Sequence, residues 1–350
     1  MTAGTPDRIV DLRSDTVTLP TPAMRRAMAE AEVGDDVFGE DPTILRLEAA
    51  AAERLGKEAA VFVASGTMGN QTCLFAHTER GDEVILDENS HIINYEVAAL
   101  AVLSAVQPRT LRGDHGILDP DEVRQAVRPP NIHHPRTRLI CVESTHNRGG
   151  GSIYPLATLR AIRRIADDHR LGVHLDGARL FNACVASGDP VREVAAQADS
   201  VSFCLSKGLG APVGSVVVGT HAFIEKVRRA RKMLGGGMRQ AGILAAAGLV
   251  ALETMVDRLK EDHANARLLA EGLAALPGVR VDLKWVQTNI VIFRLERQDL
   301  DAPGLMRKLA EQGVKALSIA PDRMRMVTHK DIDRAGITYA LEALGRVLKP

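Results

Sequence analysis

Two hydrophobic patterns alternate along the chain. One consists of short apolar runs that have the length and β-branched content of buried strands, and in the other the apolar positions recur at the period of a helix. This alternation continues to Pro212 and predicts a mostly parallel α/β sheet wound by right-handed crossovers. The run 213–218 follows its predecessor after too few residues for a crossover helix, so we expect it to be antiparallel. The predicted strands are 59–64, 81–87, 138–143, 172–175, 200–205 and 213–218.

The pattern changes beyond residue 242. Residues 243–276 form one long, nearly uninterrupted helical pattern, which we expect to bridge to a second lobe. After this bridge, strand and helix patterns mix and predict a smaller α+β lobe. Its expected strands are 288–295, 315–320 and 323–329, with one helix between the first two and a final helix after Lys330.

These changes suggest two domains, in keeping with the length of 350 residues. We place the large domain at 1–250 and the small C-terminal domain at 251–350. The first 20 residues are expected to form an N-terminal arm, because 11–18 is too polar for a core strand. Next along the chain, Thr21 and Pro22 have the order of an N-cap and first helical residue.

Polar residues follow two of the predicted strands. Asp176 comes directly after 172–175, and Lys207 follows 200–205. The carboxyl ends of parallel strands meet at one edge of a sheet, so the two side chains are expected to face one crevice. A lysine and an aspartate together point to pyridoxal phosphate, whose aldehyde bonds to a lysine and whose ring nitrogen pairs with an acid. Alternatively, Asp176 caps a helix and Lys207 is a solvated turn residue.

A candidate phosphate site lies where the predicted strand 59–64 meets the next helix. Ser65, Gly66 and Thr67 begin a turn of mostly small residues that we place at 65–70, and a helical pattern follows it to His77. The first N–H groups of a helix and its positive dipole end favour an anion, and the two hydroxyls add donors. Ordinary turn chemistry is the alternative explanation of the same residues.

Further candidates have structural explanations as well as functional ones. His91 lies at a strand-to-helix turn, where its imidazole either caps the helix or covers a flat cofactor. In the basic segment 228–239, Lys232 or Arg239 either complements the helix dipole or reaches a phosphate, including one bound by a neighbouring subunit. Arg323 and Arg325 share one strand face, either solvated or as a fork for a carboxylate.

Composition narrows the class of protein. Lys plus Arg and Asp plus Glu both number 44, so no excess charge favours nucleic acid or a membrane surface as partner. The four cysteines have neither disulfide-framework nor zinc spacing. No signal-peptide core opens the sequence, and no run approaches the ~20 apolar residues of a membrane span. We therefore expect a cytoplasmic enzyme with a small-molecule substrate and no metal.

The chain resembles the L-threonine aldolases, the low-specificity and L-allo-threonine enzymes that use pyridoxal phosphate and have the aspartate-aminotransferase fold (fold type I). DGAR followed by SKGLGAPVGS is highly discriminating, and the resemblance covers nearly the whole chain. It rests on LRSDTVT (12–18), VGDDVFGEDPT (33–43), SGTMGNQ (65–71), ESTHNRGGG (143–151), HLDGARLFNA (174–183), LSKGLGAPVGS (205–215), RKMLGGGMRQ (231–240) and RMVTHKD (325–331).

The resemblance implies a large domain with a mostly parallel seven-stranded sheet and gives each candidate a role. Lys207 would hold the cofactor covalently, Asp176 would pair with its ring nitrogen, and His91 would stack on the ring. Ser65, Gly66 and Thr67 match the residues that hold the phosphate. The substrate carboxylate would be bound by Ser14, Arg179 and Arg325, with Arg179 also near the cofactor, and His133 would lie near the substrate hydroxyl. The resemblance also implies a homotetramer with sites at a dimer interface, in which Lys232 and Arg239 lie beside a partner's cofactor. Phe38 departs from the tyrosine of many relatives.

The implied reaction is the cleavage of L-threonine, L-allo-threonine or other β-hydroxy-α-amino acids to glycine and an aldehyde. A general base would take the β-hydroxyl proton while the Cα–Cβ bond breaks, and His91 is favoured over His133 for this role. One alternative is a related fold-type-I enzyme such as a β-eliminating lyase. A second is a protein that binds pyridoxal phosphate without catalysis.

Overall fold

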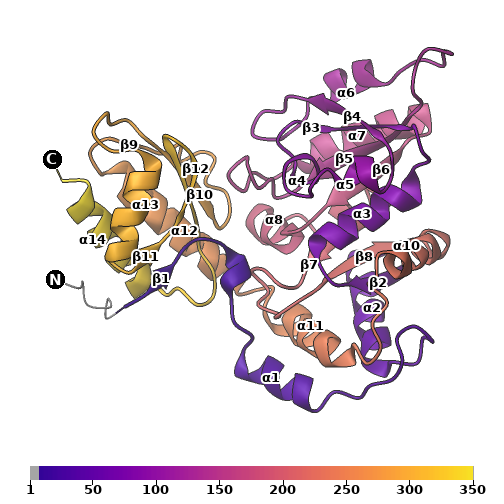
Figure 1. The fold of residues 1–350 in the computed structure, drawn as a ribbon, viewed down its shortest axis with the longest axis horizontal. Coiled ribbons are helices and arrows are strands. Elements are labelled where there is room, and N and C mark those ends of the chain that lie inside the picture. The colour runs from indigo at the N-terminus through magenta and orange to yellow at the C-terminus, as the bar shows by residue number, and fades with distance from the viewer. Residues whose placement is uncertain (1–7, 350) are drawn as a thin grey trace.

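The computed structural model describes residues 8–349, which form two lobes (Figure 1). The larger lobe contains a seven-stranded sheet in the order β2-β8-β7-β6-β5-β3-β4. Within it β8 alone runs against its neighbours, as its short connection predicted, so the mostly parallel α/β architecture is confirmed. The strands are β2 (Ala59–Val63), β3 (Glu83–Asp87), β4 (Gln107–Leu111), β5 (Thr137–Glu143), β6 (Gly172–Asp176), β7 (Ser200–Cys204) and β8 (Ser215–Gly219).

Alternate side chains of this sheet enter different hydrophobic clusters. On β2, Val61 and Val63 pack with residues of α3 (Gly66–His77) and α10 (His221–Met233), whereas Phe62 belongs to the largest cluster with residues of α2 (Pro42–Leu55) and α7 (Leu156–His169). Successive residues of a strand point to opposite faces. Helices therefore cover both faces and leave the strand ends for the site.

The other helices of this lobe are short or lie at its edge. α1 begins at Pro22 with Thr21 as N-cap, as the sequence predicted. The remaining elements are the 3-10 helix η1 (Asp15–Val17), α1 (Pro22–Ala29), α4 (His91–Asn94), α5 (Ala99–Val102), α6 (Pro120–Ala126), α8 (Leu180–Ser187), α9 (Val191–Ala195) and α11 (Gly242–Thr254).

The predicted single helix over 243–276 is wrong. The structure has two helices, α11 and α12 (Leu259–Ala274), separated by residues 255–258. Met255, Val256 and Leu259 are all buried in the core of the larger lobe. Because the apolar pattern continues through the break and no proline or glycine marks it, the sequence shows one helix where packing produces two.

The smaller lobe contains a second core, behind an antiparallel sheet in the order β12-β13-β10-β9. The polar arm also joins this lobe: β1 pairs in parallel with β11, and Val10 and Leu12 are buried in its core. The elements are β1 (Val10–Asp11), β9 (Val279–Arg280), β10 (Ile290–Leu295), α13 (Ala302–Glu311), β11 (Val314–Lys315), β12 (Leu317–Ala320), β13 (Arg323–Val327) and α14 (Arg334–Val347).

The hydrophobic clusters of the two lobes are separate. The largest cluster of the larger lobe extends along the chain to Leu259, and that of the smaller lobe combines Val10 and Leu12 with residues from Ala266 onward. The division of the chain at residue 250 stays a prediction. Across residues 8–349 we find no helix that combines the length and the apolar character needed to cross a bilayer.

Candidate active site

The candidate residues of the larger lobe follow strands that all run in one direction. Ser65, His91, Asp176 and Lys207 lie at or shortly after the carboxyl ends of β2, β3, β6 and β7. Because those ends meet at one edge of the sheet, the fold brings together residues that are up to 142 positions apart. This edge faces the smaller lobe, which supplies Arg325 from β13 (Figure 1).

Asp176 is buried, and its carboxylate is held by two donors. The Nδ2 of Asn70 donates to Oδ2 at 2.7 Å, and the backbone N–H of Ala178 donates to Oδ1 at 3.1 Å. The Oδ1 of Asn70 in turn accepts a hydrogen bond from the Ser202 hydroxyl and contacts Nε2 of His174 at 3.1 Å. This network fixes the orientation of the carboxylate beneath the site.

His91 forms a pair with a buried acid that the sequence analysis did not identify. Its Nδ1 lies 2.7 Å from Oε1 of Glu96, and Glu96 also accepts from Asn70 and Gln71. Burial lowers the pKa of His91, but the hydrogen bond to Glu96 and the charges of Asp176 and Glu96 outweigh burial and raise it. With Nδ1 held by the acid, Nε2 is the ring nitrogen left for chemistry.

The charges of Asp176 and Lys207 act in opposite directions on the pKa of His91, Asp176 raising it and Lys207 lowering it. One ring nitrogen of His91 and one carboxylate oxygen each of Glu96 and Asp176 lie within 4.8 Å of one another. Asn70 already bridges the two carboxylates with its amide nitrogen. His91, Glu96, Asn70 and Asp176 therefore form one hydrogen-bonded acid–base cluster.

The turn before α3 has the features of an anion site. Ser65 is the N-cap, and its hydroxyl oxygen accepts from the N–H of Met68. The N–H groups of Gly66 and Thr67 belong to the first turn, where no intrahelical acceptor is available. A Cβ at Gly66 would lie 2.9 Å from the Sγ of Cys204, so glycine permits the close approach of this turn to β7.

Arg179 is buried against an acid of the N-terminal segment. Its Nε and Nη2 both donate to Asp15 at 2.7 Å. Burial would raise the pKa of Asp15, but Arg179 and Lys207 hold it well below its usual range. Two donors of Arg179, the residue that the resemblance assigned to the substrate carboxylate, are thus already bonded to Asp15.

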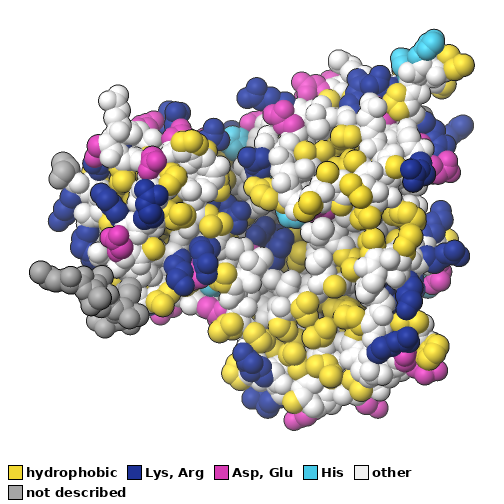
Figure 2. Space-filling view, in the orientation of Figure 1, with side chains coloured by type: hydrophobic (Ala, Val, Ile, Leu, Met, Phe, Trp, Pro, Cys, Tyr) yellow, Lys and Arg dark blue, Asp and Glu magenta, His cyan; other side chains and the backbone are white. Residues whose placement is uncertain are grey.

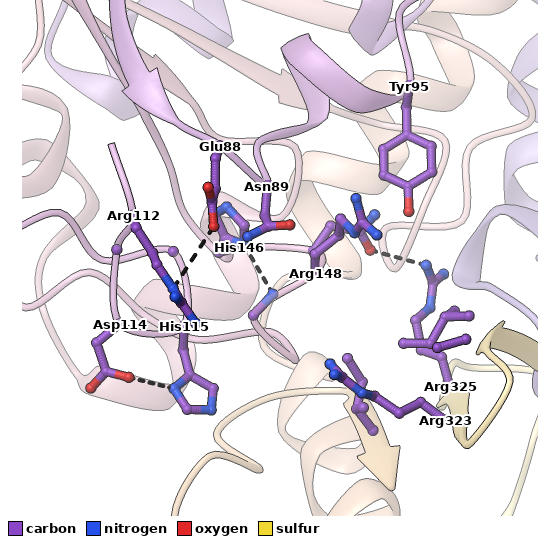
Figure 3. Close-up of a pocket in the computed structure, with 17 residues that line it drawn as sticks. Glu88, Asn89, Tyr95, Arg112, Asp114, His115, His146, Arg148, Arg323 and Arg325 are labelled. Atoms are coloured by element: carbon purple, nitrogen blue, oxygen red, sulfur yellow. Dashed lines mark hydrogen bonds and ion pairs between the residues drawn. The ribbon is translucent and has the colours of Figure 1, made fainter. Parts of the chain in front are cut away.

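Arg325 links the smaller lobe to the loop after β5. Its Nη1 donates to Oδ1 of Asn147 at 3.1 Å, and Figure 3 shows Arg325 and Tyr95 among the residues that line one pocket. Glu143 accepts from the N–H groups of both Asn147 and His91, at 2.8 and 2.6 Å. Burial lowers the pKa of Arg325 to about 10, with Arg179 acting in the same direction, so it remains charged at neutral pH.

The structure does not bring every predicted residue to this cluster. Ser14 caps η1, and its hydroxyl accepts from Thr16. His133 is exposed in the loop between α6 and β5, where its N–H donates to Asn131. Within one chain, therefore, His91 meets the acidic cluster and His133 lies outside it.

Lys232, Arg239 and Phe38 are all exposed on the larger lobe. Arg239 donates to Asp35 at 2.9 Å, and its guanidinium carbon lies 6.0 Å from the centre of the Phe38 ring. The Phe38 side chain is 73% exposed. Among residues 8–349, neither cation donates a hydrogen bond to the turn at Ser65.

Four residues of the site were missed in the sequence. Asp15, Asn70 and Asn147 lie inside motifs used for the resemblance, where the neighbouring residues received the roles, and Glu96 follows His91 by five positions in a segment without clear periodicity. Glu96 alone had an available signal, because it adjoins the apolar run 97–103 and a carboxylate is rarely buried without partners.

The comparisons with known proteins agree with this geometry. The family model described as beta-eliminating lyase matches residues 11–296. A probable low-specificity L-threonine aldolase 2 from Arabidopsis thaliana is 48% identical, with 99% of each chain covered. A low specificity L-threonine aldolase from Escherichia coli (strain K12) is 43% identical, over 93% of this chain and 95% of that protein.

A solved structure extends the agreement to the fold. The threonine aldolase of Leishmania major superposes with a TM-score of 0.85 at 19% identity, covering 97% of this chain and 99% of the other. At that identity the likeness concerns the fold, while the sequence relatives above concern the family. The chain belongs to the beta-eliminating lyase family and, within it, to the group of the low-specificity L-threonine aldolases.

Proposed function

We propose that this protein is a pyridoxal-phosphate-dependent aldehyde-lyase that cleaves L-threonine, L-allo-threonine and other β-hydroxy-α-amino acids to glycine and an aldehyde. The observation that carries the proposal is the meeting of Lys207, Asp176 and the His91–Glu96 pair at one sheet edge, opposite Arg325. The relatives named as low-specificity L-threonine aldolases support the same reaction.

The residues at this edge fit the cofactor. Lys207 offers the amine for its aldehyde, and the oriented carboxylate of Asp176 suits a protonated ring nitrogen. The free N–H groups at Gly66 and Thr67 and the hydroxyl of Thr67 suit a phosphate. When bound, pyridoxal phosphate supplies a conjugated ring that draws electrons away from the substrate's α-carbon.

The chain's own residues then divide the remaining work. Arg325 holds the substrate carboxylate and thereby sets the rotation about the bond between the amine nitrogen and Cα. His91 covers the site and takes the proton of the β-hydroxyl at Nε2 while Glu96 stabilises the imidazolium that forms. The Asn70 network keeps Asp176 in a fixed orientation throughout.

The products of threonine test the reaction type. Cleavage between Cα and Cβ gives glycine and acetaldehyde, whereas β-elimination gives ammonia and a 2-oxo acid. We expect glycine and acetaldehyde in equal amounts when purified enzyme is incubated with pyridoxal phosphate and L-threonine. Ammonia as the main product would identify an eliminating enzyme, and cofactor absorbance without turnover would identify a binding protein.

Replacing His91 with phenylalanine is expected to lower kcat for threonine by roughly 10²–10⁴, the usual contribution of a general acid–base group. Phenylalanine preserves a flat ring over the site but cannot accept a proton. Steady-state rates measured across the pH range would give both kcat and its profile.

The matched control for that variant is His133→Phe, since His133 is exposed in this chain. It is expected to retain turnover of the wild-type order. If His133→Phe loses activity while His91→Phe keeps both rate and profile, proton removal belongs to His133 delivered by a second copy of the chain.

Glu96→Gln tests the positioning of the base separately from its presence. The acid raises the pKa of His91, so its loss is expected to lower that pKa. A base works in its neutral form, and the acid limb of kcat against pH therefore moves to lower pH in the variant. Glutamine preserves the shape of the side chain, so an unmoved limb would contradict the coupling of Glu96 to His91.

Arg325→Lys is expected to raise KM for threonine by about tenfold or more, with a smaller effect on kcat. Lysine keeps the charge but cannot form the bidentate pair with a carboxylate. The control is Arg280→Lys on β9, whose side chain is 73% exposed. An unchanged KM in Arg325→Lys would remove Arg325 from carboxylate binding.

The proposal includes the assembly and location of the enzyme. The site is completed in a homotetramer, in which Lys232, Arg239 and the Phe38 loop of one subunit reach the cofactor of its neighbour. The exposure of Phe38 on the same surface as these cations supports this arrangement. Four free cysteines support a reducing, cytoplasmic location.

A further inference from the structure

A cleft of about 750 Å³ lies between the two lobes, beside Arg325. Its walls come from the loop after β5, the hairpin at 112–116 and the smaller lobe's sheet. Figure 2 shows basic side chains along the region between the lobes, and Figure 3 shows those of the cleft itself. The arginines that line it are Arg112, Arg148, Arg323 and Arg325.

The acids that line the cleft lie beside basic groups other than Arg148, Arg323 and Arg325. The carboxylate of Glu88 lies 3.9 Å from Arg112, and that of Asp114 lies 2.8 Å from Nδ1 of His115. Both acids are substantially exposed. Neither therefore neutralises the arginines nearer to the site.

Arg148 and Arg323 have little compensation for their charges. Arg148 donates to the amide oxygen of Asn94 at 2.9 Å, and across residues 8–349 no carboxylate forms an ion pair with it. Arg323 lies 3.8 Å from Asp322, whose other oxygen is held by Arg294 at 2.6 Å. Like charges that line one cleft raise the local concentration of an anion.

The arrangement connects this cleft with the carboxylate site. Arg323 and Arg325 lie two positions apart on β13, so their side chains emerge on the same face. Arg148 lies over Tyr95, with its guanidinium carbon 6.0 Å from the ring centre, and Tyr95 stacks on His91. A ligand held by Arg325 thus has two further guanidinium groups within the same cleft.

We propose that Arg148 and Arg323 form a subsite for a second acidic group on the substrate, so that the enzyme accepts β-hydroxy-α-amino acids that are dicarboxylic. This inference rests on the proposed cleavage reaction and names a substrate class for it. The smallest such substrate is β-hydroxyaspartate. Guanidinium groups suit it because they bind carboxylates through paired hydrogen bonds.

The reaction on this substrate balances without another reactant. The Cα–Cβ bond breaks, and its electron pair remains with Cα, which takes up one proton. The β-hydroxyl loses one proton, and its carbon becomes an aldehyde that carries the second carboxylate. The products are glycine and glyoxylate.

The kinetic test compares kcat/KM for β-hydroxyaspartate, in both diastereomers, with kcat/KM for threonine. Arg148→Gln and Arg323→Gln are expected to lower this ratio by about tenfold or more, as for a lost charge-assisted hydrogen bond. Arg307→Gln, which removes an exposed charge of α13 outside the cleft, is expected to preserve the ratio. An unchanged ratio overturns the subsite, whether kcat/KM stays the same for both substrates or falls equally for both.

A binding test separates this inference from the proposed function. Succinate and butyrate have the same carbon chain, but only succinate has a second carboxylate. Calorimetry on the holoenzyme is expected to show succinate binding at least about tenfold more tightly, with the difference lost in Arg323→Gln. If the enzyme cleaves threonine but binds succinate no more tightly than butyrate, the subsite alone is overturned. If it binds succinate more tightly but does not cleave threonine, the proposed reaction is overturned and the subsite is retained.

Discussion

Lys207→Ala is expected to abolish both the visible absorbance of lysine-bound pyridoxal phosphate and nearly all turnover of threonine. Lys207 is the lysine at the carboxyl end of β7, and its charge acts on both His91 and Asp15. Its backbone carbonyl, which accepts from the Thr18 hydroxyl at 3.1 Å, is retained in the variant. The loss is therefore expected to be chemical, with the fold preserved, and absorbance spectra with steady-state rates measure it.

Two further variants sharpen this experiment. Lys207→Arg keeps a positive charge but has no amine for the aldehyde, so it is expected to lose the absorbance as well. Lys308→Ala removes an exposed lysine of α13 and is expected to leave absorbance and rate intact. If Lys207→Ala kept the absorbance and about a tenth of wild-type activity, the covalent role would belong to another residue.

Asp176→Asn is expected to reduce kcat by several orders of magnitude while the folded structure persists. A neutral amide cannot keep the cofactor's ring nitrogen protonated, so the ring becomes a weaker acceptor of electrons. Both oxygens of Asp176 accept hydrogen bonds, from Asn70 and Ala178. The amide nitrogen of asparagine cannot accept, so the variant also loses one of these two bonds. Single-turnover rates and thermal unfolding would separate the loss of chemistry from a loss of stability.

The control for charge is Asp257→Asn, an exposed aspartate between α11 and α12. Its rate and unfolding temperature are expected to match those of the unmodified protein, because an exposed surface substitution rarely changes stability. Near-normal kinetics in Asp176→Asn would assign the ring nitrogen to a different group. Glu96, the other carboxylate of the cluster, would then be the next residue to test.

The sequence by itself determined the elements whose signals are local. Strand patterns predicted six of the seven strands of the larger sheet but missed β4, whose residues are exposed or half-buried, and a short connection made β8 antiparallel. A local cap placed the start of α1 correctly at Pro22, whereas α3 begins at Gly66, earlier than the helical pattern after Asn70 indicated. Because the ends of parallel strands share an edge, the same patterns also predicted that Asp176 and Lys207 would lie at one site.

The tertiary structure decided whatever depended on contacts between distant segments. Arg179 meets Asp15 across 164 positions, and Arg325 meets Asn147 across 178, so neither pair has a sequence spacing to reveal it. The break between α11 and α12 was hidden because burial continues through it. Periodicity reports which face of an element is buried, whereas the partner of a polar side chain is fixed only when the lobes pack.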